Sequence, residues 1–118
     1  MTVGRGLPMI RLGELRPVLD ANKLTKGLRG GLVGGRKQTA RLRPVEGGLT
    51  VEIYGSATFV PWASGSLPQE LAVDPSMLAG FITKTTKSFH PAELVTFDLG
   101  ADRLRLVCGT LEATFKLL

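Results

Sequence analysis

The stretch of sequence that decides the fold runs Glu70-Leu-Ala-Val-Asp-Pro-Ser-Met-Leu-Ala-Gly-Phe-Ile82. Its first four residues predict a short strand. Asp74 followed by Pro75 then predicts a helix start, because an aspartate N-cap accepts hydrogen bonds from unpaired amides and proline is favoured at the first helical position. We therefore expect a strand that leads almost directly into a helix.

Apolar residues recur along this helix at the 3.6-residue helical period. The face expected to be buried carries Met77, Leu78, Phe81, Ile82 and Thr85, and the opposite face carries Ser76, Thr83 and Lys87. His90-Pro91 ends the helix, because proline is poorly tolerated in a helix interior. Three strands are expected after it, over residues 94–99, 104–108 and 111–117, with turns at 101–102 and 109–110.

The residues upstream of this stretch repeat the same order. A strand over residues 8–12 is expected to precede a helix that starts near Arg16, with Pro17 at its first position. The apolar face of that helix carries Val18, Ala21, Leu24, Thr25 and Leu28. The Gly-rich stretch 27–35 is expected to end it and form a loop. Strands over 38–43, 49–54 and 57–61 follow, with turns at the Gly-Gly of residues 47–48 and at 55–56, and then a loop over 62–69.

The fold class that follows is α+β, with two halves that each contain a strand, a helix and a three-stranded meander. Residues 8–118 are expected to form a single domain, and residues 1–7 a flexible N-terminal tail. Two helices should pack on one side of antiparallel sheets. The residues expected to be buried in the helices include Val18, Ala21, Met77, Phe81 and Ile82.

Composition narrows the class of protein. The chain has 118 residues, of which 43% are apolar, as in an ordinary globular domain. Its single cysteine, Cys108, rules out an intrachain disulfide and fits a reducing compartment. No apolar run approaches the roughly 20 residues of a membrane span, and the N-terminus does not resemble a signal peptide. We therefore expect a cytoplasmic protein without membrane association.

Positive charge is concentrated in the first part of the chain. Residues 1–44 hold ten basic and two acidic residues, a net +8, whereas residues 45–118 hold five basic and eight acidic residues, a net −3. A one-sided basic balance attracts polyanions, of which nucleic acid is the foremost. The alternative is a charge bias that serves solubility alone.

Three segments carry a resemblance to a known family. They are Val45-Glu-Gly-Gly-Leu-Thr-Val-Glu-Ile53, Glu70–Ile82 and Asp102-Arg-Leu-Arg-Leu-Val-Cys-Gly-Thr-Leu-Glu-Ala-Thr-Phe-Lys-Leu117. Together with the order of elements, they resemble one domain of the bacterial beta sliding clamp, the processivity subunit of DNA polymerase III. The resemblance implies a DNA-clamp-like domain of two βαβββ halves. The chain has one such domain where the clamp subunits have three, and Tyr54-Gly-Ser-Ala-Thr-Phe59 replaces the family's peptide-pocket segment.

The resemblance also implies where DNA would bind, because clamp helices line the channel that surrounds the duplex. Lys/Arg side chains there would contact phosphates without reading sequence. The candidate nucleic-acid-binding residues are Arg16, Lys23 and Lys26 on the first helix, Lys87 on the second, and Arg29, Arg36 and Lys37 beside the Gly-rich stretch. For the helix residues, the alternative interpretation is an ordinary solvated face.

No residue pattern predicts catalysis, a metal site or a cofactor. His90 lies in a loop without a nucleophile beside it in sequence, and Cys108 lies among apolar strand residues that predict a packing role. A zinc site needs several Cys or His ligands, and the chain holds one of each. The Gly-rich stretch lacks the Gly-Lys-Ser/Thr ending of a phosphate-binding loop.

Two functions of different classes remain. The first is a non-enzymatic, clamp-like protein that assembles with itself through sheet edges, contacts duplex DNA through its phosphates and serves DNA replication. The second is a protein-interaction module of clamp fold that binds a partner, such as a replication protein or a host replication clamp. A small enzyme is a third and weaker interpretation.

Overall fold

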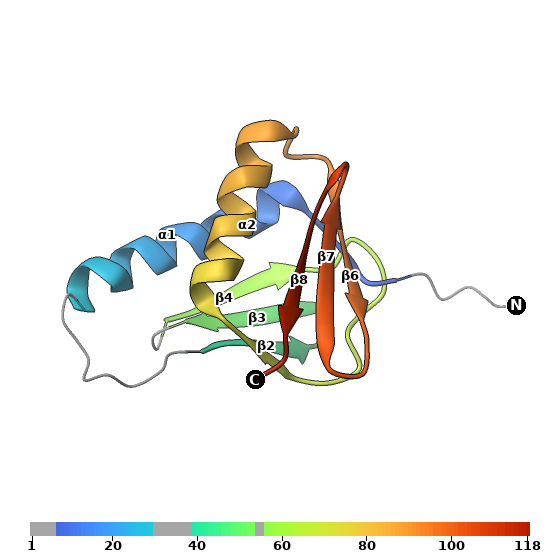
Figure 1. Ribbon diagram of the computed structural model, residues 1–118, viewed down its shortest axis with the longest axis horizontal. Coiled ribbons are helices and arrows are strands. Elements are labelled where there is room, and N and C mark those ends of the chain that lie inside the picture. Colours follow the sequence, from blue (N-terminus) through green and yellow to red (C-terminus); the bar gives the residue numbers. More distant parts are fainter. Residues whose placement is uncertain (1–6, 30–38, 54–55) are drawn as a thin grey trace, which may run out of the picture.

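The computed structural model describes residues 7–29, 39–53 and 56–118, with the backbone alone for residues 21–29 (Figure 1). The elements follow one another in two similar series. The first series is β1 (Met9–Arg11), α1 (Leu12–Arg29), β2 (Ala40–Val45), β3 (Gly48–Ile53) and β4 (Ser56–Pro61). The second is β5 (Leu71–Val73), α2 (Pro75–Ser88), β6 (Leu94–Leu99), β7 (Arg103–Cys108) and β8 (Leu111–Lys116). The α+β class and the division into two halves agree with the prediction.

Each half contributes its first strand to the sheet of the other half. The two antiparallel sheets have the orders β1-β6-β7-β8 and β4-β3-β2-β5. Ile10 of β1 lies opposite Val95 of β6, and Val73 of β5 lies opposite Ala40 of β2. Because neither four-stranded sheet can be completed by one half alone, the two halves form one folding unit.

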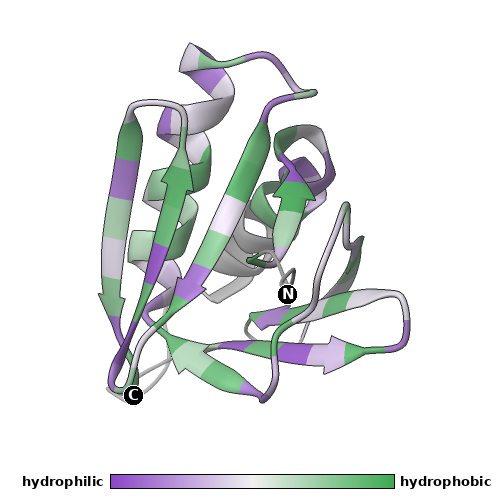
Figure 2. Ribbon diagram, turned by 90° about the vertical axis from the view of Figure 1, so that its right-hand side faces the viewer, coloured by the Kyte–Doolittle hydropathy of each residue, from purple (hydrophilic) through white to green (hydrophobic). Residues whose placement is uncertain are grey.

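Both helices lie on the same side of the molecule. Figure 2 shows the strands of one sheet in front of the helices and the other sheet below them, and the helices contact each other and strands of both sheets. The outer faces of the sheets form the opposite side. The expected packing of two helices on one side of antiparallel sheets is therefore confirmed.

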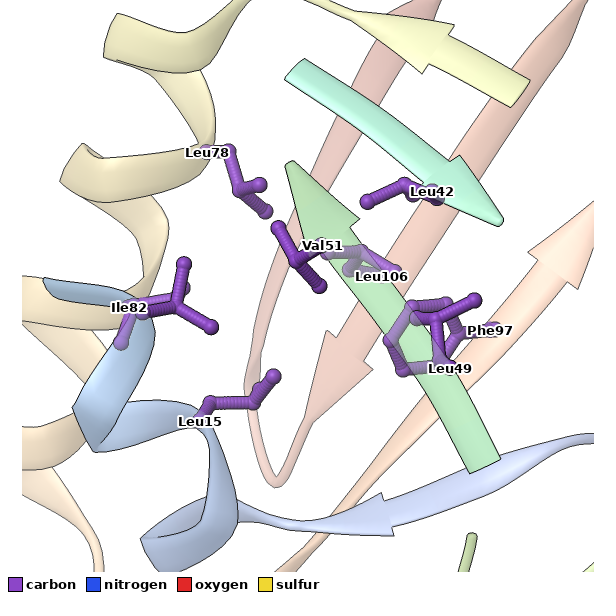
Figure 3. Close-up of a pocket in the computed structure, with 9 residues that line it drawn as sticks. Leu15, Leu42, Leu49, Val51, Leu78, Ile82, Phe97 and Leu106 are labelled. Atoms are coloured by element: carbon purple, nitrogen blue, oxygen red, sulfur yellow. The ribbon is translucent and has the colours of Figure 1, made fainter. Parts of the chain in front are cut away.

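The core lies between the helices and the sheets. Side chains from both halves converge there, as Figure 3 shows, and surround a cavity of only about 10 Å³. Its lining is Leu15, Val18, Leu42, Leu49, Val51, Leu78, Ile82, Phe97 and Leu106. Because this lining is entirely apolar and a buried water needs polar partners, the cavity is an ordinary packing gap.

The start of α1 was wrongly predicted. The helix begins at Leu12 and encloses Pro17, instead of starting near Arg16. Its first two amides have acceptors, since Leu12 N–H donates to Glu93 O and Gly13 N–H donates to Pro91 O. Burying Leu12 and Leu15 contributes about 1.5–3 kcal/mol each, which offsets the roughly 3 kcal/mol cost of an interior proline.

The observed end of α1 also differs from the prediction. The helix continues through Gly27 to Arg29, and residues 30–38 of the Gly-rich stretch lie outside the described residues. Of its predicted apolar face, Val18 is buried as expected. The side chains of Ala21, Leu24, Thr25 and Leu28 are outside the described part. Residues 1–6 of the expected tail are outside it as well.

Helix α2 begins as predicted. The Asp74 carboxylate accepts from the amides of Ser76 and Met77, with Pro75 at the start of the helix. Thr85 is fully buried, and its hydroxyl donates to Phe81 O at 2.8 Å and Ile82 O at 3.0 Å. Met77 is the exception, because 48% of it is exposed. At 100° per residue it lies about 90° from the centre of the buried stripe.

The predicted turns lie close to their observed positions. The β2–β3 turn is Glu46-Gly47, and Gly47 has φ +80°, a conformation that favours glycine. Gly48 belongs to β3 instead of the turn. A Cβ atom there would lie 2.5 Å from Val60 O and 2.6 Å from the Phe59 ring. The turn between β3 and β4, predicted at 55–56, falls partly outside the described residues, and Ser56 already belongs to β4.

The exchanged strand predicts cooperative unfolding. Ile10→Ala should lower the free energy of unfolding by about 2–5 kcal/mol, because it removes a fully buried side chain from β1. Since both halves share the sheets, the loss should appear as one transition. Far-UV circular dichroism and the fluorescence of Trp62, which packs on Phe97, measure this. Exposed Arg11→Ala is the control and should change stability by less than about 0.5 kcal/mol. Separate transitions from the two signals would contradict the prediction.

Two glycines should respond to alanine in opposite directions. Gly48→Ala should destabilise the fold, because the new methyl group meets the Val60 carbonyl and the Phe59 ring. Gly80→Ala should stabilise it by about 0.5–1 kcal/mol, since the position is helical with open space around it. Chemical denaturation of the two variants measures both effects. Equal changes would contradict the contacts described at Gly48.

Candidate nucleic-acid interface

The helix layer presents basic side chains to solvent. Arg16 is exposed on α1, and Lys87 is exposed on α2. Lys84 is also exposed on α2 and was not among the residues predicted from the sequence. It precedes Lys87 by three residues, so the two lie on one helical face. No acidic residue occurs within α2, whereas α1 carries Glu14 and Asp20.

The remaining predicted residues are only partly placed. Lys23, Lys26 and Arg29 belong to α1, but their side chains lie outside the described part of the chain. Arg36 and Lys37 lie outside the described residues altogether. The structure therefore places Arg16 and Lys87 on the helix layer and leaves the other five as predictions.

Arginines on the outer faces of the sheets are held in ion pairs. On β2, Arg41 and Arg43 both contact Glu70, at 3.4 and 3.7 Å, and Arg43 also contacts Glu52 at 3.4 Å. On β7, Arg105 bridges Asp98 at 2.9 Å and Glu112 at 3.2 Å. Arg103 contacts Asp102 at 3.3 Å. These pairs are exposed, so each adds little stability, but together they neutralise four arginines.

The exposed cations of the two helices are not held in ion pairs of this kind. All ten acidic residues of the chain lie within the described ranges. Among the described side chains, Arg16, Lys84 and Lys87 have no carboxylate within 4.0 Å. Arg11 and Lys116, on the sheets, share this property. Three described cations of the helix layer are therefore outside any ion pair, and the exposed acids Glu14 and Asp20 lie on the same layer, in α1.

His90 has a local structural role. Its Nδ1 accepts from the Ala92 amide at 3.0 Å, and its carbonyl accepts from the Glu93 amide at 2.9 Å. These bonds shape the 91–93 loop, whose carbonyls receive the first amides of α1. Within the described ranges, no three His, Cys, Asp or Glu residues gather as a metal-binding group would. None of the described helices combines the length and apolar character that crossing a membrane requires.

Cys108 is buried at the end of β7, as a packing residue would be. Burial raises the pKa of its thiol, and the negative charge of Glu93 adds to this effect. The native state therefore favours the neutral thiol, which is the less reactive form.

Cys108 should therefore report on unfolding. At neutral pH the native protein should react with a thiol-specific reagent far more slowly than the denatured protein. The raised pKa of this thiol stabilises the fold fully at low pH, and that contribution should be lost as pH rises above about 9. Reaction rates and denaturation curves at several pH values measure both effects. Rapid labelling of the native state would contradict burial of the thiol.

Two comparisons with known proteins bear on this chain. A scan against protein-family models finds no match. A search of curated proteins also finds no match.

Proposed function

We propose that this protein is a non-enzymatic, clamp-like DNA-associating protein that contacts duplex DNA through its helix layer and assembles with itself through sheet edges. The observation that carries the proposal is the distribution of charge. Four sheet arginines are neutralised by ion pairs, while Arg16, Lys84 and Lys87 on the helix layer are exposed without a carboxylate nearby. A polyanion would meet its strongest attraction on the helix side.

The chemistry of these side chains suits contact without sequence readout. Lysine is a mobile point charge that binds phosphate through one flexible ammonium group, and it does not impose a fixed geometry on a base edge. Contacts of this kind release counterions and bind every sequence similarly. Loose, non-specific attraction is what a protein needs in order to move along a duplex.

Assembly follows from the size of the domain. One domain presents two helices on one side and cannot surround a duplex. Its short edge strands are partly covered, because Met9 of β1 bonds to Ser64 and Ala63, and Ala72 O of β5 accepts from Leu118 N–H. Among the described residues, nothing pairs with the outer edges of β4 and β8. Self-assembly through these longer edges, in the cytoplasm and in the service of DNA replication, completes the proposal.

The DNA proposal is tested by charge reversal on the helix layer. The variant Lys84→Glu/Lys87→Glu should bind duplex DNA more weakly, with a log–log salt slope smaller by about 2, because two phosphate contacts are lost. The variant Arg16→Glu/Lys23→Glu/Lys26→Glu should act in the same direction. The measurement is retention on closed circular and linear DNA at low and moderate salt. An assembly that closes into a ring should remain longer on the circular form, because it can slide off an end of the linear form, whereas a dimer that does not surround the duplex should be retained equally on both.

The matched control reverses the same number of charges on the sheet side. Arg11 and Lys116 are exposed on β1 and β8, so Arg11→Glu/Lys116→Glu changes the net charge equally. It should leave most of the binding intact. An equal loss in both double variants would show that net charge alone governs binding. Absence of binding at low salt would reject the DNA proposal and favour the protein-interaction module.

A further inference from the structure

The edges of β4 and β8 occupy equivalent places in the two halves. Ile53 lies opposite Ser56 and Cys108 lies opposite Leu111, with two residues between the strands in each case. This register makes Phe59 equivalent to Thr114, and Thr58 equivalent to Ala113. The two edges can therefore be compared position by position through their side chains.

The backbone groups that face each edge follow from the ladder. Trp62 N–H donates to Gly47 O, so the groups of Val60, Thr58 and Ser56 also point toward β3, because antiparallel ladders alternate. Ala57 and Phe59 then direct their N–H and C=O groups away from the sheet. In β8, Leu117 N–H donates to Asp102 O, so Glu112, Thr114 and Lys116 face the edge in the same way.

The two edges differ in how strongly they resist pairing. On β8, charged Glu112 and Lys116 stand at the edge positions, and charges of this kind discourage strand pairing. On β4 the equivalent positions are Ala57 and Pro61, and the strand carries no charge. The tripeptide Ala-Thr-Phe occurs in both strands, shifted by one residue. This shift buries Phe115, of which 1% is exposed, and leaves Phe59 56% exposed.

We propose that β4 pairs antiparallel with β4 of a second copy of this chain, about a two-fold axis that passes between the two Thr58 residues. Ala57 of one copy then lies opposite Phe59 of the other. The amides of Ala57 and Phe59 each donate to a carbonyl of the second copy. Pro61, which has no amide hydrogen, lies beyond this hydrogen-bonded segment. The Phe59 rings lie on a diagonal, a spacing within reach of aromatic side chains.

Pairing of β4 with a second β4 places its side chains in a more favourable environment than pairing with β8 would. Against β8, Phe59 and Ala57 would lie beside Glu112, which is paired with Arg105, and beside Lys116, whose ammonium group would lose water without gaining an ion partner. Against a second β4, apolar side chains meet apolar side chains. The inference deepens the self-assembly part of the proposed function by naming the edge and the symmetry.

The symmetry has a consequence for the helix layers. A two-fold axis that relates antiparallel neighbours in a sheet is perpendicular to that sheet, so both copies keep their helices on the same side. The dimer would therefore present Arg16, Lys84 and Lys87 twice on one surface. A doubled basic surface increases attraction to a duplex, although DNA binding by one copy does not require the dimer.

Cysteine cross-linking tests the register directly. In the proposed dimer the two Thr58 residues form a non-hydrogen-bonded pair with Cα atoms about 4.5 Å apart, within the range for a disulfide. Thr58→Cys should therefore form a dimer under mild oxidation. The matched control is Ala113→Cys, the equivalent position on β8, which should remain monomeric on denaturing gels. A covalent product that forms only when the two variants are mixed would indicate β4–β8 pairing and overturn the proposal.

Solution mass provides the second measurement. The 12.6 kDa chain should sediment as a dimer, and Ala57→Lys/Phe59→Thr should sediment as a monomer with an unchanged circular dichroism spectrum. The introduced lysine side chain would lie opposite Glu52 within its own sheet, so this variant is designed to fold. The control Thr114→Ala should remain dimeric. A monomeric wild-type chain would overturn the inference, while salt-dependent DNA retention judges the proposed function separately.

Discussion

The exchange of first strands between the two halves is the constraint on which the rest of the structure depends. A three-stranded meander exposes the edge of its first strand, and here that edge is occupied by the first strand of the other half. The exchange carries the helices with it, because α1 follows β1 immediately and α2 follows β5 after Asp74. Each helix therefore starts at the edge of a sheet that belongs mainly to the opposite half, and both helices come to one side. The apolar core between the helices and the sheets is a consequence of this strand exchange, since its buried residues come from both halves.

The exchange of first strands also gives the molecule two kinds of surface, the outer faces of the sheets and the helix layer. The outer faces of the sheets carry cross-strand ion pairs, in which arginines reach acids on neighbouring strands. Among the described side chains, the helix cations Arg16, Lys84 and Lys87 have no carboxylate within 4.0 Å. Exposed ion pairs contribute little to stability, so their main effect is to cancel the charge of four sheet arginines. The uncancelled charge on the other side is the physical basis for the proposed interaction with DNA.

The edge strands of the two sheets differ in how well they are covered or protected by charge. Met9 and Ala72, on the short edge strands, are bonded by other segments of the chain, and β8 carries charges that discourage pairing. β4 has the equivalent pairing register to β8 but presents an exposed phenylalanine and no charge. Natural sheets usually protect such an edge. Among the described residues, no segment pairs with this edge, which is the basis for the proposed pairing with a second copy.

The sequence by itself determined the order of elements, the start of α2 and most of the buried face of that helix, because alternation, helical periodicity and N-capping are properties of neighbouring residues. It also showed the excess of basic residues at 1–44. Only the tertiary structure decided that α1 starts at Leu12, since the acceptors for its first amides lie at residues 91 and 93. Likewise, Arg41 and Arg43 belong to the basic segment, but acids at 52 and 70 neutralise them. Met77 is exposed because it lies at the margin of the buried stripe of α2. Phe59 is exposed because its place in β4 is shifted by one residue from the place that Phe115 has in β8. Strand exchange, ion pairing and register are set by contacts between residues far apart in the chain, which no local pattern records.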